Sequence, residues 1–416
     1  MNSLPTRAFY GWRIVVAASL NLFFAVGIIF YGFPVFYPLL VQSLGFTRAQ
    51  ATQGFLIGFL LVGLPFGFLA GVLIDRVGAR WVILAGAGLV GGSLLFMGFM
   101  SRLWQYYLLC VTEVIGYVLA GPIPNQVLVT NWFHAKRGRA MGYAYLGLGA
   151  GGAVSPLLVN YLAGHFGWHR AIEILGVMIL VVLLPVGGWV TRSAPRDMGL
   201  LPDGSNPTYK VRISVETPPA AGGDIAYAIR SPNFWLLVAG CTLVVGAIGA
   251  VIQHLILFLK DQGYSSGAAS QVSSCLLVSS LAGRVLVGHL ADRFVKKNVM
   301  AWFYLLLGLS IPLLYLAHRP PAVWMFAVLF GFAMGADYML IPLVTAECFG
   351  LAALGKLLAL IIMGYSLGQW LAPWLAGRIF DVHHSYDMAW AIMTVATVVG
   401  AATIYAVSPS RSRQSA

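Results

Sequence analysis

Long apolar runs recur throughout this 416-residue chain, with few residues between them. A helix needs about 20 mostly apolar residues to cross the hydrocarbon core of a bilayer, because lipid offers no partner to an unpaired backbone group. We place about twelve such runs at 12–40, 51–74, 81–100, 104–132, 140–162, 169–191, 233–259, 265–290, 298–317, 322–349, 355–380 and 386–407. The sequence therefore predicts an all-α membrane protein with twelve transmembrane helices.

The composition excludes a water-soluble fold. Hydrophobic residues make up 59% of the chain and charged residues 9%, whereas ordinary soluble domains carry about 25% charged residues. The first run is too long for the apolar part of a cleavable signal peptide, so we expect it to remain as a helix. The four cysteines fall inside predicted spans without metal-type spacing, which indicates packing residues.

The net charge of +12 has its simplest explanation in membrane topology. Most lysines and arginines fall in the loops that share a side with the two termini, and that side is the cytoplasm by the positive-inside rule. We therefore expect a multi-pass protein of the cell (cytoplasmic) membrane with both termini cytoplasmic. The lipid bilayer is an expected partner, a nucleic acid is not, and a monomer would suffice.

The second half of the chain repeats landmarks of the first. The segment from Gly71 to Arg76 aligns with the segment from Gly288 to Arg293, and proline pairs follow at nearly the same offset. Duplication predicts two pseudo-symmetric six-helix bundles. We expect the first bundle at 1–191, a Pro- and Gly-rich cytoplasmic linker at 192–232, and the second bundle at 233–416.

The loop Gly71-Val-Leu-Ile-Asp-Arg-Val-Gly-Ala-Arg80 resembles the loop motif of the major facilitator superfamily, and the second half carries a copy. The resemblance covers nearly the whole chain and implies that superfamily's fold, with two bundles that expose a central site alternately to each side. Carboxylates in these loops can face helix N-termini and neighbouring arginines. We expect a gating latch built from Asp75, Arg76, Asp292 and Arg293, with a plain positively charged loop as the alternative.

Narrower motifs resemble the monocarboxylate porters and their relatives, the oxalate and formate exchangers. These motifs are Tyr10-Gly-Trp12, Phe30-Tyr-Gly-Phe-Pro34, and Lys136 to Gly142 before a Gly-rich fifth helix. The resemblance implies transport of small organic acids.

Arg284 is a charged residue inside the eighth predicted helix, near the membrane centre by its distance from the loop. A guanidinium stays protonated, and its planar fork matches a carboxylate with two parallel hydrogen bonds. In the porters that this chain resembles, an arginine of the eighth helix holds the substrate carboxylate. We expect Arg284 to bind substrate, while a structural ion pair with Asp337 is the alternative.

Asp337 lies in the tenth helix at a depth close to that of Arg284. A carboxylate that competes with substrate for one arginine takes up a proton when displaced, which couples an anion to a proton. The alternative is a purely structural salt bridge between Asp337 and Arg284.

Two further titratable residues lie inside predicted spans. His254 is expected to contact substrate or relay a proton, and Glu113 is expected to take part in proton coupling. Packing roles are the alternatives for both.

Four tyrosines of helices one, four, ten and eleven are candidate substrate-binding residues, because a phenol can hold a small acid while its ring shapes an apolar pocket. They are Tyr31, Tyr117, Tyr338 and Tyr365. Helices three and nine carry no charge within their spans and helix twelve only Asp387 at its start, and all three are expected to face lipid.

The chain also departs from its relatives. Animal porters have a lysine where this chain has Val35 and an aspartate where it has Ser280, and the oxalate exchanger has a second cation in helix eleven, which is missing here. A single fixed positive charge suits a substrate with one carboxylate better than a substrate with two carboxylates.

The polar centre belongs mainly to the second half of the chain, because the repeat aligns Arg284 with Gly67.

We find no phosphate-binding loop, metal-ligand cluster or nucleophile constellation, so we expect neither an enzyme nor a cofactor or metal. The leading hypothesis is a secondary active transporter of lactate- or pyruvate-like monocarboxylates, coupled to protons. The alternatives are an exchanger or exporter of other organic anions or small solutes, including oxalate/formate antiport and drug efflux, or a non-transporting membrane sensor.

Overall fold

The computed structural model describes residues 9–63, 72–74, 76–133, 137–204, 225–349 and 354–408, and helices are the only regular elements among them. The chain forms two compact units. Unit 1 consists of Met1–Phe36 and Ile57–Ile213, and unit 2 of Tyr37–Leu56 and Ser214–Ala416. An all-helical chain follows from the lipid environment, where only a helix satisfies all of its backbone groups within one segment.

Unit 1 is built around a long helical run, α8, that packs against the first helix of the chain and against α5. Its described elements are α1 (Gly11–Leu22), η1 (Phe23–Gly32), η2 (Phe33–Val35), η3 (Phe59–Gly63), α5 (Ala79–Met97), α6 (Leu103–Ala120), α7 (Pro122–Trp132), α8 (Arg137–Pro185), η4 (Val186–Val190), η5 (Pro195–Met198) and η6 (Pro202–Gly204). The run of α8 turns at Gly167, whose φ of 76° is left-handed, so it comprises two helices.

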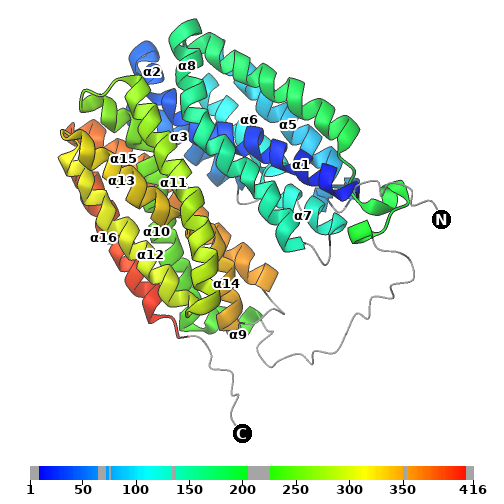
Figure 1. Ribbon diagram of the computed structural model, residues 1–416. Coiled ribbons are helices and arrows are strands. Elements are labelled where there is room, and N and C mark those ends of the chain that lie inside the picture. The colour runs from blue at the N-terminus through cyan, green and yellow to red at the C-terminus, as the bar shows by residue number, and fades with distance from the viewer. Residues whose placement is uncertain are drawn as a thin grey trace. The chain divides into compact units, whose positions relative to one another are not determined.

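Unit 2 has α10 at its centre, in contact with α11, α15 and α16. Its described elements are α2 (Tyr37–Leu44), α3 (Arg48–Gly58, which ends at the unit boundary), α9 (Ile225–Arg230), α10 (Pro232–Asp261), α11 (Ser266–Arg293), α12 (Lys296–Ser310), η7 (Ile311–Leu316), α13 (Pro320–Met334), α14 (Asp337–Phe349), α15 (Leu354–His383) and α16 (Asp387–Ala406). Figure 1 shows α10, α12 and α16 running alongside one another.

Helical residues lie in each of the twelve predicted runs. By length and composition, seven helices among the described residues are long and apolar enough to cross a membrane. The number is smaller than twelve because α8 counts once although it turns at Gly167, because Pro320–Met334 and Leu340–Phe349 are shorter apolar helices, and because the count covers only the described residues. The count of twelve and the cytoplasmic position of the termini stay predictions, as do the predicted domain bounds.

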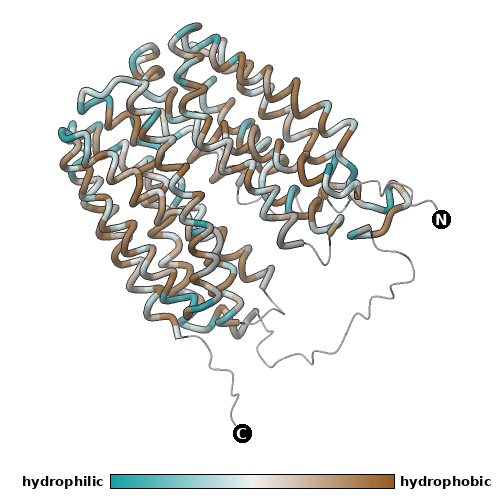
Figure 2. Tube along the Cα trace, in the orientation of Figure 1, coloured by the Kyte–Doolittle hydropathy of each residue, from teal (hydrophilic) through white to brown (hydrophobic). Residues whose placement is uncertain are grey.

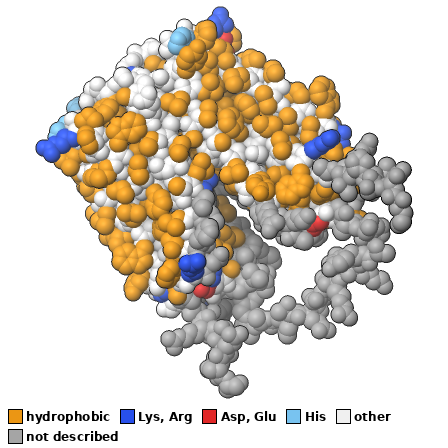
Figure 3. Space-filling model, viewed as in Figure 1, with side chains coloured by type: hydrophobic (Ala, Val, Ile, Leu, Met, Phe, Trp, Pro, Cys, Tyr) orange, Lys and Arg blue, Asp and Glu red, His pale blue; other side chains and the backbone are white. Residues whose placement is uncertain are grey.

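The surface of the helices carries the apolar residues that a bilayer requires. Hydrophobic residues continue along the lengths of the helices, and hydrophilic residues gather toward helix ends and turns (Figure 2). Large apolar side chains are exposed, including Trp189 at 78%, Phe99 at 73% and Trp302 at 67%. Figure 3 shows such side chains spread over one face, with the few lysines and arginines grouped apart. In water such patches would drive aggregation, whereas in lipid they are solvated.

Glycines bring α8 against the start of the chain. A Cβ on Gly151 would lie 2.6 Å from the carbonyl oxygen of Phe23, and a Cβ on Gly27 would lie 2.7 Å from Gly151. Such backbone contact between helices requires residues without side chains, and small residues are typical of helix interfaces in membranes. The glycine-rich start of α8 therefore serves helix packing, as its composition predicts.

Gly151→Ala should destabilise the protein by about 1–3 kcal/mol, because the new methyl group overpacks the contact with η1. Gly142→Ala on the same helix is the matched control, since no atom of a described residue lies within 4 Å of its Cβ position. The control should match or exceed the parent's stability, because alanine is the better helix former. Thermal unfolding in detergent measures both, and equal midpoints for the two variants would contradict the packing assignment.

Candidate functional site

A buried carboxyl group begins α14 in unit 2. Asp337 is 2% exposed, and its Oδ1 accepts a hydrogen bond from the hydroxyl of Tyr304 in α12 at 2.7 Å. The same hydroxyl interacts with the thiol of Cys241 in α10. Three helices thus contribute to one polar cluster within an apolar core. A buried carboxyl group without such partners would cost several kcal/mol, which explains why a phenol faces it.

Arg284 lies near this cluster because its helix, α11, is in close contact with α13. A Cβ on Gly283, Gly331 or Gly335 would collide with the backbone of the opposite helix, and for Gly335 the nearest atoms include the amide nitrogen of Arg284. Gly335 stands two residues before Asp337, so the glycine contact places the guanidinium and the carboxyl group in the same region of unit 2. A larger residue would separate them.

The charges of Arg284 and Asp337 act on one another, yet they form no ion pair within 4 Å. The Arg284 side chain is half-buried and makes no hydrogen bond to a residue that the structure describes. Among the described residues its planar donor fork thus meets no acceptor, and a guanidinium beside a buried carboxyl group can bind an anionic ligand.

His254 lies elsewhere in unit 2. It is fully buried in α10, with Nδ1 2.9 Å from the hydroxyl of Tyr386 and Nε2 2.8 Å from the carbonyl oxygen of Pro373. Because a carbonyl only accepts, Nε2 carries a hydrogen and donates it. Both ring nitrogens are thus occupied, so in this conformation His254 has no free group for a substrate.

Glu113 lies in α6 of unit 1 and is fully buried. Both of its carboxyl oxygens lack a hydrogen-bond partner among the described residues. A charged carboxylate in such a place would cost several kcal/mol, and protonation removes that charge. This geometry is compatible with a proton site.

The candidate tyrosines divide between the two units. Tyr31 in η1 and Tyr117 in α6 interact electrostatically in unit 1, together with Tyr145 of α8. Tyr365 is buried in α15 of unit 2. The backbone of Tyr338 belongs to α14, while its side chain lies outside the described part of the chain.

The predicted latch falls largely outside the described residues. Asp75 is not described, and the side chain of Asp292 is not described either. Arg76 and Arg293 are exposed and form no ion pair with a carboxylate that the structure describes. The latch therefore stays a prediction.

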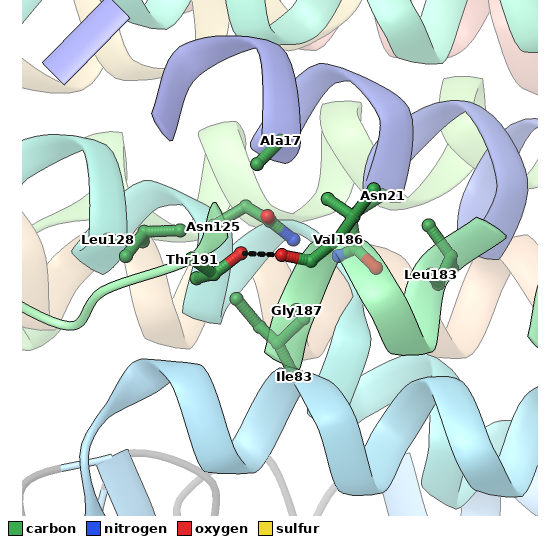
Figure 4. A pocket seen from close by; sticks show the side chains of 9 residues that line it. All are labelled: Ala17, Asn21, Ile83, Asn125, Leu128, Leu183, Val186, Gly187 and Thr191. Carbon is green, nitrogen blue, oxygen red and sulfur yellow. Dashed lines mark hydrogen bonds between the residues drawn. The ribbon is translucent and has the colours of Figure 1, made fainter. Parts of the chain in front are cut away.

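A small cavity in unit 1 adjoins the break between α6 and α7 (Figure 4). Asn21 and Asn125 donate their amide hydrogens to the carbonyl of Ala120, and Asn125 also donates to that of Gly121. These bonds satisfy carbonyls that the helix break leaves open. Thr191 donates to the carbonyl of Val186 across the cavity wall. We assign these residues a structural role at the helix break.

Sequence reasoning missed Tyr304. The ninth helix lacks charged residues within its span and was expected to face lipid, yet Tyr304 is fully buried and holds Asp337. A tyrosine near the centre of an otherwise apolar span is the available signal, since a phenol hydroxyl needs a partner when it is buried.

The family model of the Major Facilitator Superfamily matches residues 19–293 and 260–416, which together take in most of the chain. The chain belongs to the major facilitator superfamily. Its members carry small molecules across membranes in multi-pass helical folds, so this chain is a membrane transporter by family.

Relatives within the superfamily are distant. The chain is 25% identical to the MFS transporter asaE of Aspergillus flavus over 76% of this chain and 67% of the relative. It is 24% identical to Monocarboxylate transporter 13 of Bos taurus over 96% of this chain and 90% of the relative. The crystal structure of the nucleoside transporter NupG matches with a TM-score of 0.74 and 13% identity, and covers 95% of this chain and 99% of that one. This last likeness concerns the fold alone.

Tyr304→Phe should lower the stability of the protein by about 1.5–3 kcal/mol, because it removes a buried hydrogen bond to a carboxyl group. Tyr405→Phe, which alters an exposed phenol of the same unit, is the control and should leave stability unchanged. Thermal unfolding in detergent at several pH values is the measurement. An unchanged midpoint for Tyr304→Phe would show that the hydroxyl does not hold Asp337.

Proposed function

We propose that this transporter carries small monocarboxylates of lactate or pyruvate size, together with protons, by alternating access. The observation that carries the proposal is the guanidinium of Arg284 near the buried Asp337 in unit 2, with no hydrogen-bond partner among the residues that the structure describes. The similarity to a monocarboxylate transporter over nearly the whole chain supports the same substrate class.

The charge balance of the site favours one carboxylate per substrate. Arg284 provides one fixed positive charge, and Asp337 opposes it when no ligand is bound. An anion that binds Arg284 takes over the role of Asp337, which then gains stability by accepting a proton. Substrate and proton would thus enter together, and Tyr304 would keep the carboxyl group in place throughout.

Further residues are proposed in supporting roles. Tyr31 and Tyr117 in unit 1 and Tyr338 and Tyr365 in unit 2 would shape the apolar part of the substrate site. Glu113 would serve as a second proton site. Asp75, Arg76, Asp292 and Arg293 would form the cytoplasmic latch of the two halves in a multi-pass protein of the cell membrane.

Two other functions are open to test. An exchanger or exporter of other organic anions or small solutes predicts that oxalate, formate or lipophilic compounds compete with monocarboxylates. A membrane sensor predicts ligand binding without flux. A competition panel in reconstituted vesicles distinguishes all three, and the positive charge of Arg284 favours a small anion over a neutral compound.

Arg284→Lys should lower the uptake of labelled lactate or pyruvate into vesicles by about tenfold or more, because lysine keeps the charge but loses the paired hydrogen bonds. Arg284→Ala should abolish uptake. Arg319→Lys, an exposed arginine of the same unit, is the control and should transport normally. Uptake by Arg284→Ala at the parent's rate would refute the binding proposal.

Asp337→Asn should separate coupling from binding. A neutral amide cannot take up the proton, so accumulation driven by an imposed pH gradient should be lost while exchange of internal for external substrate persists. The measurement compares both modes in the same vesicles, with Glu113→Gln as a second variant. If Asp337→Asn still accumulates substrate against its gradient at the parent's level, Asp337 is not the coupling residue.

A further inference from the structure

One segment of the N-terminal half of the sequence packs in unit 2, together with the C-terminal half. Residues 37–56 connect the first two predicted spans, but they are part of unit 2. The chain leaves unit 1 after Phe36 and returns to it at Ile57. This segment, which we call the crossing segment, is therefore joined covalently to unit 1 at both ends while its side chains pack in unit 2.

Arg48 is the centre of its attachment. Its guanidinium makes two parallel hydrogen bonds to Asp261 at the end of α10, at 2.5 and 2.7 Å. The guanidinium carbon also lies 3.6 Å from the ring centre of Phe380 in α15. A bidentate ion pair over an aromatic ring is among the strongest polar contacts available to arginine.

The backbone beside Arg48 adds a second attachment. The amide groups of Arg48 and Ala49, at the start of α3, donate to the two carboxylate oxygens of Asp381 at 3.1 and 3.0 Å. A helix N-terminus favours a negative charge in this position. A Cβ on Gly377 would lie 2.9 Å from Ala49, so the glycine permits this approach.

Further along α3, an aromatic contact continues the attachment. The ring of Phe55 stacks on that of Trp370, with centres 5.6 Å apart and planes inclined by 24°. The crossing segment is thus held on α15 along most of α3, at its charged start and near its apolar end.

The network extends from Arg48 into the core of unit 2. Arg48 donates to the hydroxyl of Tyr386 at 2.9 Å. That hydroxyl then directs its own hydrogen to Nδ1 of His254, whose Nε2 donates to Pro373. In this arrangement His254 is neutral, since a protonated ring would place a second cation beside Arg48. The buried histidine therefore has a role, as support for the tyrosine that Arg48 contacts.

Arg48 keeps its positive charge in this environment. Burial acts to lower the pKa of Arg48, but the hydrogen bond to Asp261 and the interactions with Tyr386 raise it above its ordinary value. Arg48 therefore stays positively charged, and the strength of its contacts depends on their geometry.

Irregular helical turns flank the crossing segment on both sides. Before it, η1 is a π-helix and η2 a short 3₁₀-helix that contains Pro34, and after it, η3 is again a π-helix. Such turns within a helix frequently mark hinges and functional sites. Both connections to unit 1 therefore pass through backbone that bends more easily than an α-helix.

From these observations we propose that Arg48 is a gating residue of the transport cycle: its contacts hold the crossing segment on unit 2 in one conformation, and they break as the flanking turns bend in the other. The proposal rests on transport by alternating access and is independent of which substrate is carried.

Hydrogen exchange tests the attachment without any substrate. In the full-length protein in nanodiscs, Arg48→Ala and Gly377→Ala should each raise amide exchange in residues 48–56 by about tenfold, the effect of losing one charge-assisted hydrogen bond. Exchange in α5 should stay as in the parent. Arg319→Ala is the exposed control. Unchanged exchange in 48–56 for both variants would overturn the proposal.

Kinetics on the two membrane faces separates a gate from a structural contact. With labelled lactate, Asp261→Asn and Arg48→Ala should change the ratio of the KM values measured from the two sides, because they favour one conformation. A merely structural role would lower the maximal rate and leave this ratio unchanged, and that result would also overturn the proposal. If no lactate is transported by the parent, the substrate proposal fails, while the exchange experiment still decides the role of Arg48.

Discussion

The close crossing of α11 and α13 is the contact on which the candidate site depends. Gly283, Gly331 and Gly335 let the two backbones meet, and this contact brings Arg284 into the region where α14 begins with Asp337. Two charged groups are costly inside a membrane protein unless they influence one another, and the crossing provides that proximity without a direct ion pair.

The two units use polar residues differently. Unit 2 contains the Arg284 site and, at the ends of α10 and α15, the network of Arg48, Asp261 and Tyr386. Unit 1 contains Glu113, whose carboxyl group has no described partner, and asparagines that repair a helix break. The pseudo-symmetry of the sequence is thus one of architecture, while the chemistry is concentrated in the second half.

Much of this arrangement was predictable, for physical reasons. Apolar runs identify helices because lipid permits little else, and Arg284 and Asp337 are conspicuous because charges are rare in spans. The family followed from loop motifs. Contacts between distant residues were not predictable: Arg48 meets Asp261 and Tyr386 only through the fold, and nothing local shows that residues 37–56 pack with unit 2. Tyr304 was missed because its helix lacks charge, and the partners of His254 lie more than a hundred residues away in the sequence.

The central claim is that a guanidinium recognises the carboxylate of the substrate, and calorimetry on the purified protein tests it most directly. L-lactate and its uncharged amide, lactamide, have nearly the same shape and differ in the group that Arg284 would bind. The account predicts that lactate binds at least about tenfold more tightly than lactamide, since charge-assisted paired hydrogen bonds are lost with the amide. Equal affinities for the two compounds would contradict it, because recognition would then not involve the carboxylate charge.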